Sequence, residues 1–156
     1  MPSSDALPLD YRAAGGVIVR PSQEVLVLER PARGEIRLPK GHIDPGEAPL
    51  QTALREIAEE SGFQRLRLLA DLGTQRVAFP YQGRTWVREE HYFLFLREGP
   101  TEPDTAAESQ FIPRWVSWET AEEILSFEPE REWVRRARAA WARHLPPAPF
   151  HAGGHA

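Results

Sequence analysis

Apolar positions follow two different spacings along the chain, and each spacing predicts its own kind of element. Short runs rich in β-branched and aromatic residues, bounded by proline, glycine or polar turns, predict strands. The first two runs are joined at residues 21–23 and the two longest near residues 82–83. Gly15–Gly16, inside the first run, indicates a bulge or the close approach of another segment. Strands are therefore expected at residues 13–20, 24–30, 65–80, 85–97 and 111–116.

Helical spacing of apolar residues marks the segment that follows the second strand. Leu50, Ala53, Leu54 and Ile57 form a stripe that can face a core. Gly62 then supplies the left-handed residue that commonly ends a helix. The stretch between these elements, residues 31–37, has neither spacing and is predicted to be a loop.

Two more helices are predicted near the C-terminus. Ser117 is the expected N-cap of a helix at about 118–126. Pro129 begins the last helix, at about 129–144, which carries Trp133 and Trp141 on one stripe. Strands followed by a helix, strands and helices predict a mixed sheet with helices packed on it, in the α+β class.

Composition is that of one small globular domain. The chain has 156 residues, of which 41% are hydrophobic and 27% charged, and we expect a flexible arm at 1–10, a domain at 11–145 and a disordered tail at 146–156. The net charge of −4 gives no reason to expect DNA binding, and the absence of cysteine excludes disulfides and thiolate chemistry. We see no membrane-spanning run and no secretory signal, and we expect a cytoplasmic protein.

The main group of candidate functional residues is a set of acidic side chains on the first predicted helix. Glu56, Glu59 and Glu60 fall on one face because residues three and four apart are neighbours on a helix. Carboxylates this close repel one another unless a cation lies among them, and hard oxygen ligands suit Mg²⁺ or Mn²⁺. The alternative, a solvated acidic surface, is the better interpretation of the Glu59–Glu60 pair alone. The concentration of negative charge over the whole segment favours a metal site, and Arg55 could bend back to hold a glutamate.

Residues 41–63, GHIDPGEAPLQTALREIAEESGF, resemble the Nudix box, G-x5-E-x7-R-E-U-x-E-E-x-G-U with U apolar. Every fixed position of that motif is filled. The resemblance implies an α/β/α sandwich around a mixed sheet. It also implies that divalent cations assist hydrolysis of a nucleoside diphosphate linked to another moiety.

The resemblance further implies roles for individual residues. The metal ligands would be Glu56, Glu59 and Glu60, with the carbonyl of Gly41. Glu47 would lie near the metal, and Arg55 would orient the glutamates. The reaction would be attack of a metal-activated water on phosphorus, without a covalent enzyme intermediate.

The general base is less closely defined, because the family takes it from different places. We rank Glu60 or Glu56 ahead of three glutamates outside the motif: Glu89, Glu90 and Glu108. Glu89 and Glu90 lie on a predicted strand and face opposite sides of it, so at most one of them points into the site.

Segments outside the motif point to the substrate. Residues 38–47 resemble diadenosine polyphosphate hydrolases and diphosphoinositol polyphosphate phosphohydrolases, and residues 87–95 and 119–131 resemble the dinucleoside polyphosphate group. That group often has an aromatic residue near the position of Arg37, so its base-stacking contacts do not transfer directly. Arginines near the motif, with Lys40 as the single lysine, could form a basic rim for several phosphates.

Each substrate contact has a structural alternative. The arginines could be ordinary surface charges, the aromatic residues core, and the histidines structural. Tyr81, Trp86 and Tyr92 could stack on a base. The substrate-binding candidates are Lys40, Arg37, His42, Arg30, Arg88 and Tyr92.

Three functions remain open. The first is a Mg²⁺-dependent hydrolase of dinucleoside polyphosphates such as diadenosine tetra- to hexaphosphate. The second is the same chemistry on a nucleotide sugar, ADP-ribose, an oxidised nucleotide, an inositol pyrophosphate or an RNA 5′ end. The third is a nucleotide-sensing module without catalysis, against which the complete motif argues. The partner in each case is a small molecule, and the protein could be a monomer or a homodimer.

Overall fold

The computed structural model describes residues 7–145 and contains a seven-stranded sheet within them. The expected tail at 146–156 and the first six residues of the expected arm lie outside this range. The last residues of the arm are held in place, since Asp10 exchanges two hydrogen bonds with the backbone of Val87, at 2.8 and 2.7 Å. The strands are β1 (Tyr11–Val19), β2 (Glu24–Arg30), β3 (Glu35–Arg37), β4 (Lys40–His42), β5 (Arg67–Tyr81), β6 (Arg84–Leu96) and β7 (Ile112–Ser117). The helices are α1 (Pro49–Ser61), α2 (Trp118–Ile124), α3 (Glu128–His144) and a short 3₁₀ turn, η2 (Pro31–Arg33).

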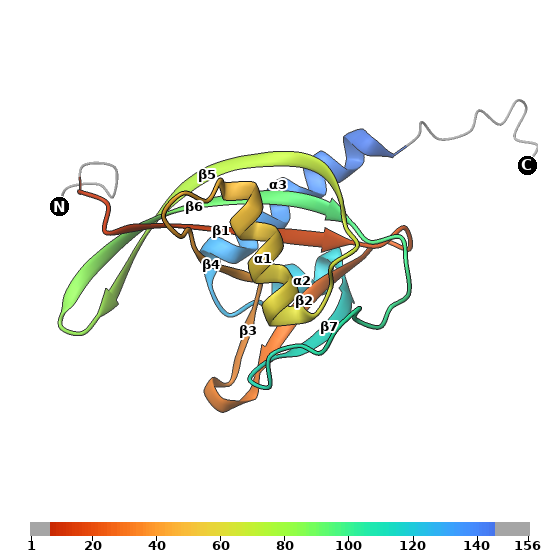
Figure 1. Ribbon diagram of the computed structural model, residues 1–156, viewed down its shortest axis with the longest axis horizontal. Coiled ribbons are helices and arrows are strands. Elements are labelled where there is room, and N and C mark those ends of the chain that lie inside the picture. Colours follow the sequence, from red (N-terminus) through yellow and green to blue (C-terminus); the bar gives the residue numbers. More distant parts are fainter. Residues whose placement is uncertain (1–6, 146–156) are drawn as a thin grey trace, which may run out of the picture.

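The sheet is mixed and has helices on both faces (Figure 1). Its strands run in the order β3-β2-β1-β6-β5, with β4 paired to β1 and β7 paired to β2. β1 and β6 are parallel, and the other pairs are antiparallel. One core cluster joins the sheet to α2 and α3, and a second joins its other face to α1. The predicted α/β/α sandwich is confirmed.

The predicted strands and helices are present with small shifts at their ends, but the loop predicted at 31–37 is wrong. That stretch contains η2 and β3, and β4 follows after two residues. Each of these two strands has three residues, which is too short for a periodic pattern. They form because β2 and β1 offer them backbone partners.

Glycines and a helix cap predicted from the sequence determine where segments approach closely and where helices begin and end. A Cβ at Gly15 would lie 2.3 Å from the carbonyl oxygen of Pro39, so glycine allows the approach that the sequence indicated. Gly62 has φ +81° and ends α1, as predicted. Ser117 caps α2 by accepting a hydrogen bond from the backbone of Thr120, also as predicted.

The β5–β6 hairpin extends beyond the rest of the sheet (Figure 1, green). Its predicted turn lies at Gln82 and Gly83, which both have positive φ. Among residues 7–145, no helix is long and apolar enough to cross a membrane.

Candidate active site

The helix α1 packs one face on the sheet and places its glutamates beside β4, at the border of that face. Ala53 and Ile57 are buried against the core, together with Ser61. Leu54, expected on the buried stripe, is 37% exposed because the face that packs on the sheet is centred on Ala53 and Ile57. Glu56 and Glu60 therefore lie beside β4, and Glu59 lies on the solvent side of the helix.

Arg55 bends back over the start of the helix, as the sequence suggested. Its Nε and Nη2 each donate to the Glu47 carboxylate at 2.8 Å, and its Nη1 donates to Glu56 at 2.8 Å. A longer bond of 3.4 Å reaches Glu59. The guanidinium of Arg55 lowers the pKa of Glu47 to about 2, and so keeps that carboxylate charged. One arginine thus gathers three of the motif's four glutamates.

Glu56 lies directly against the backbone of β4. A Cβ at Gly41 would lie 2.1 Å from the carboxyl carbon of Glu56. Gly41 does not have positive φ, so the reason for glycine here is the space that the Glu56 carboxylate occupies. Burial raises the pKa of Glu56, and the charges of Glu59 and Glu108 raise it further.

Glu60, one turn further along α1, is bonded to the same strand at the neighbouring residue. Its Oε1 accepts a hydrogen bond of 2.9 Å from the backbone of Lys40. Burial raises the pKa of Glu60 to about 8, and the charges of Glu56 and Glu108 add to the effect. The site therefore concentrates acidic groups that a nearby positive charge would stabilise in their ionised form.

The donor set fits a hard divalent cation. Glu56, Glu59 and Glu60 offer carboxylate oxygens, which Mg²⁺ and Mn²⁺ prefer. Within the described part of the chain, no three acidic or histidine side chains already converge as a formed metal site. Glu59 is 47% exposed and makes only the long contact to Arg55, so it is free to turn toward the other two.

The three candidate bases outside the motif lie in different places. Glu108 lies in the loop between β6 and β7, where its backbone N–H donates to the carbonyl of Glu59 at 3.1 Å. Glu108 is therefore attached to the helix that carries the carboxylates, and its charge contributes to the raised pKa of Glu56 and Glu60. Glu89 pairs with Arg12 across the neighbouring strands β1 and β6, at 3.4 Å.

Glu90 lies on the opposite face of the sheet. Its carboxylate is fully buried and accepts bonds from Arg88 at 2.6 Å and from the indole of Trp133 at 2.7 Å. The two strand glutamates do face opposite sides. The placement of Glu90 under α3 separates it from the carboxylates of α1.

Several expected substrate contacts are engaged within the protein. Tyr92 is fully buried and stacks on Trp133 at 4.6 Å, so it contacts the core and not a surface ligand. Arg30 donates to Gln110 at 3.0 Å. Burial lowers the pKa of Lys40, whose ammonium is influenced by Glu130 on the α3 side of the sheet.

The remaining substrate candidates line a pocket of about 780 Å³ beside the half of the β5–β6 hairpin that is nearer its turn. Arg37 and Arg88 lie in its wall, and each guanidinium also faces an aromatic ring at 4.7 Å. His42 joins this pocket to the carboxylates, because it is a lining residue whose ring lies 4.2 Å from that of Tyr11 while its carbonyl accepts from Arg55 at 3.2 Å. The aromatic lining residues are Tyr11, Phe79, Tyr81, Trp86 and Phe127.

Sequence reasoning missed part of this lining. Tyr11, Phe79 and Phe127 come from three distant segments, and no local pattern connects them. Tyr11 and Phe79 meet because β1 pairs with β6 and β6 pairs with β5. Phe127 joins them from the turn between α2 and α3.

The fold and the site define a domain that combines an acidic, metal-compatible helix with an aromatic and basic pocket. The NUDIX domain family matches residues 10–140, and the chain belongs to this family, whose members act on pyrophosphate bonds of nucleotide derivatives.

Relatives with different named activities resemble the chain. It is 30% identical over 140 residues to an RNA pyrophosphohydrolase of Erythrobacter litoralis, covering 77% of this chain and 81% of that protein. It is 35% identical over 91 residues to the asymmetrical bis(5′-nucleosyl)-tetraphosphatase of Rattus norvegicus, covering 58% of this chain and 60% of that protein. The C. elegans Ap4A hydrolase binary complex superposes with a TM-score of 0.68 at 26% identity, covering 85% of this chain and 98% of that one. The chain spans about three fifths of the length of several curated relatives.

Proposed function

We propose that this protein is a Mg²⁺-dependent pyrophosphohydrolase that cleaves a phosphoanhydride bond of a dinucleoside polyphosphate, such as diadenosine tetra- to hexaphosphate. The observation that carries the proposal is the continuity of the two halves of the site at His42. His42 lines the aromatic pocket with its ring against that of Tyr11, and its carbonyl is bonded to Arg55 of the carboxylate helix. A substrate with its base in the pocket would extend its phosphates toward α1.

The carboxylates of α1 would hold the cation. Glu56, Glu59 and Glu60 are the proposed ligands, together with the carbonyl of Gly41. When bound, Mg²⁺ or Mn²⁺ would neutralise charge on the phosphate oxygens and lower the pKa of water. Arg55 has a positioning role, since it fixes Glu47 and Glu56 at 2.8 Å and leaves Glu59 mobile.

The acceptor of the water's proton is a carboxylate at the edge of this cluster. Glu60 and Glu56, ranked first from the sequence, are proposed here as ligands of the cation. We therefore propose Glu108 as the base, because its loop is bonded to α1 at the carbonyl of Glu59 and its side chain lies outside the ligand set. A base outside the ligand set stays free to accept a proton when its neighbours are occupied by a cation.

The pocket supports a nucleotide with a base at its end. Aromatic side chains provide stacking surfaces, and Arg33, Arg37 and Arg88 lie in the same wall. Arg37 and Arg88 each donate through Nε to a carboxylate, Glu130 at 2.8 Å and Glu90 at 2.6 Å, so they offer phosphates only their remaining N–H groups and their positive charge. The similarity to an Ap4A hydrolase and to an asymmetrical tetraphosphatase supports a substrate that carries two nucleosides and not one.

A substrate panel with Mg²⁺, resolved by ion-exchange chromatography, tests the proposal. It contains diadenosine tetra-, penta- and hexaphosphate, ADP-ribose, 8-oxo-dGTP, a diphosphoinositol polyphosphate and a 5′-triphosphate RNA. We expect a clear preference for the dinucleoside polyphosphates, with ATP among the products. Preference for RNA would match the relative from Erythrobacter litoralis and would replace the proposed substrate while keeping the chemistry. Binding without turnover of any compound would favour a nucleotide-sensing module.

The pocket's part is tested by Phe79→Ala in the same assay. Phe79 lies in the pocket wall, with its ring under the guanidinium of Arg88. Loss of one stacking surface should raise KM for dinucleoside polyphosphates about tenfold, since base stacking is worth about 1–3 kcal/mol. Ile112→Ala is the matched control, because Ile112 is an exposed apolar residue of β7 outside the pocket. An unchanged KM in Phe79→Ala would show that the base of the substrate does not bind in this pocket.

A further inference from the structure

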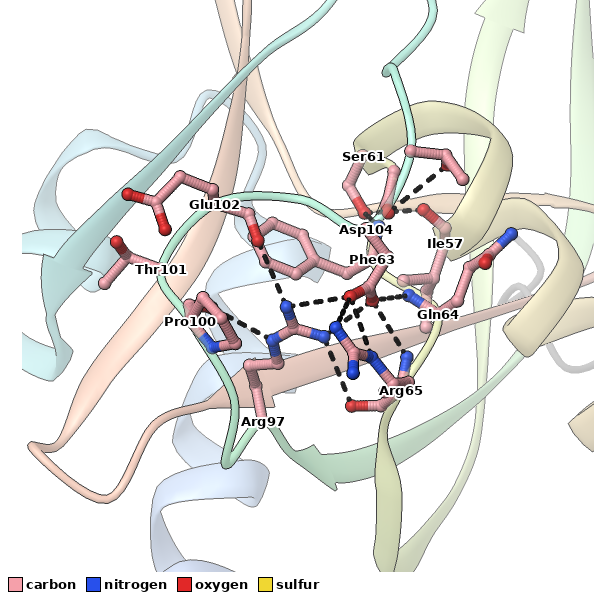
Figure 2. Close-up of polar contacts among 12 residues, drawn as sticks. Ile57, Ser61, Phe63, Gln64, Arg65, Arg97, Pro100, Thr101, Glu102 and Asp104 are labelled. Carbon is pink, nitrogen blue, oxygen red and sulfur yellow. Dashed lines mark hydrogen bonds and ion pairs between the residues drawn. The ribbon is translucent and has the colours of Figure 1, made fainter.

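A buried ion pair lies outside the candidate active site, at the end of β6. Arg97 is 0% exposed, and its Nη1 and Nη2 donate to the two carboxylate oxygens of Asp104 at 2.6 and 3.1 Å. The same guanidinium donates to the carbonyls of Pro100 and Glu102, each at 3.1 Å, and lies 4.9 Å from the ring centre of Phe63 (Figure 2). Arg97 is therefore surrounded by acceptors that come mostly from one loop.

Asp104 connects this loop to the chain that leaves α1. Its carboxylate accepts the backbone N–H of Gln64 at 2.8 Å and that of Arg65 at 3.1 Å, as well as two bonds from the Arg65 side chain (Figure 2). The backbone of Asp104 donates to the carbonyl of Gly62 at 2.9 Å, at the C-terminal end of α1. The bonds from Arg97 hold the pKa of Asp104 well below its usual range, so the pair stays charged.

The same loop continues to the carboxylates of α1. Four residues after Asp104, the backbone of Glu108 donates to the carbonyl of Glu59 at 3.1 Å. The Glu108 side chain accepts from Gln110 at 2.5 Å, and Gln110 accepts from Arg30 at 3.0 Å. The loop is thus attached to α1 at both ends of the segment that carries Glu108.

Burying a charged pair such as Arg97 and Asp104 adds little to the stability of a protein, so stability alone does not explain this arrangement. A buried ion pair is about as stable as, or less stable than, well-packed apolar residues, whereas it fixes geometry closely. Residues 97–111 form an irregular connection between β6 and β7, and loops of this length are usually functional when ordered. Because Glu108 belongs to this loop, an ion pair that fixes the loop also fixes the position of Glu108.

We propose that Arg97 and Asp104 are positioning residues that hold the β6–β7 loop on the end of α1 and thereby set the place of Glu108 beside the α1 carboxylates. The inference rests on the proposed function for its kinetic consequence. The loop restraint itself does not depend on it. The pair acts on turnover and not on the pocket, since neither residue lines the pocket wall.

Amide hydrogen exchange of the metal-free full-length protein tests the restraint. In Asp104→Asn, the amides of Asp104, Thr105 and Glu108 should exchange about tenfold faster or more, because a charge-assisted bond is lost. Amides in the middle of α1 and β6 should keep their protection. Glu119→Gln is the control, since it removes charge from an exposed ion pair with Arg138 elsewhere in the fold. Unchanged exchange at Glu108 in Asp104→Asn would overturn the proposal.

Steady-state kinetics test the consequence with a double-mutant cycle. We expect Asp104→Asn to lower kcat about tenfold while KM stays within about twofold. Combined with Glu108→Gln, it should lower kcat no further than Glu108→Gln alone, because both changes remove the same contribution. Additive losses, or a loss carried by KM, would contradict the proposal. If the wild type cleaves no substrate, the proposed function fails while hydrogen exchange still decides the restraint.

Arg65→Ala provides a milder variant if Asp104→Asn does not fold. Arg65 is 76% exposed, and its removal takes away two bonds to Asp104 while leaving the buried pair intact. We expect a two- to threefold increase in exchange at Asp104 and Glu108 and a decrease in kcat of similar size. No change in either measurement would count against the proposal.

Discussion

Adding one methyl group at Gly41 should separate activity from stability. In Gly41→Ala the new Cβ would lie 2.1 Å from the carboxyl carbon of Glu56 and 2.3 and 2.4 Å from its oxygens. Real Cβ atoms keep at least 3.0 Å from such neighbours, so the carboxylate has to retreat by about 1 Å. The neighbour is the end of a flexible side chain, which can move without displacing the backbone.

The two consequences differ greatly in size. A displacement of about 1 Å in a catalytic group can cost about 100-fold in rate. For stability, alanine at an allowed φ contributes about 0.4–1 kcal/mol through the unfolded state, and a shifted Glu56 rotamer costs about 0.5–1.5 kcal/mol. The free energy of unfolding should therefore change by less than about 1 kcal/mol while kcat falls by about two orders of magnitude.

The assay combines urea unfolding with Mg²⁺-dependent turnover of the preferred substrate. Gly73→Ala is the matched control, because its Cβ would meet nothing within 4 Å but its φ is +82°. That variant should lose about 1–2 kcal/mol of stability and keep its kcat. A Gly41→Ala protein with full activity would refute the argument that Glu56 needs its place against β4. Unfolding of Gly41→Ala would show that the contact is structural.

Three further predictions follow from the site. Arg55→Lys should lower kcat at least tenfold, because lysine cannot keep the paired bonds to Glu47. Arg55 lowers the pKa of Glu47 from 4.5 to about 2, so their contact stabilises the fold above about pH 4.5 and this stabilisation is lost as the pH falls toward 2. Arg55→Lys should therefore also have a smaller free energy of unfolding in urea at pH 6. The raised pKa of Glu60, about 8, means that the folded metal-free protein retains a proton that the unfolded chain releases near pH 4.5. Its free energy of unfolding in EDTA should therefore fall between pH 5 and 8, and a Glu60→Gln variant with the same slope would contradict this assignment. Gly62→Ala should lose about 2 kcal/mol or more in thermal unfolding, because φ is +81° and the Cβ would lie 2.1 Å from the Thr105 carbonyl oxygen; wild-type stability would contradict the strain.

The helix and its carboxylates could be predicted because their information is local. Glu56, Glu59 and Glu60 lie within five consecutive residues, and helical geometry alone places them on one face. The contact of Arg55 with a glutamate could also be predicted, because Arg55 lies on this helix and Glu47 lies just before its start. Leu54 was placed incorrectly on the buried face because periodicity defines a stripe only to within about one residue on either side.

The pocket and the Glu108 loop depend on distant pairings. Tyr11 and Phe79 share a wall only because β1, β6 and β5 are neighbours in the sheet. Alternation on β6 indicated that Glu89 and Glu90 face opposite sides, but only the position of α3 decides which side is closed. The role of Arg97 had no sequence signal, because its partners are mostly loop carbonyls that any residue type provides.

The central claim is that the α1 carboxylates form a metal-dependent hydrolytic centre. Mg²⁺-dependent turnover of the preferred nucleotide by Glu59→Gln tests it most directly, since Glu59 is half exposed and makes one long contact, so its charge contributes little to the fold. Glu123→Gln, an exposed glutamate on α2, is the control. The account predicts a decrease in kcat of at least 100-fold for Glu59→Gln, with wild-type unfolding, and no change for Glu123→Gln. Wild-type turnover by Glu59→Gln would contradict the assignment of the site.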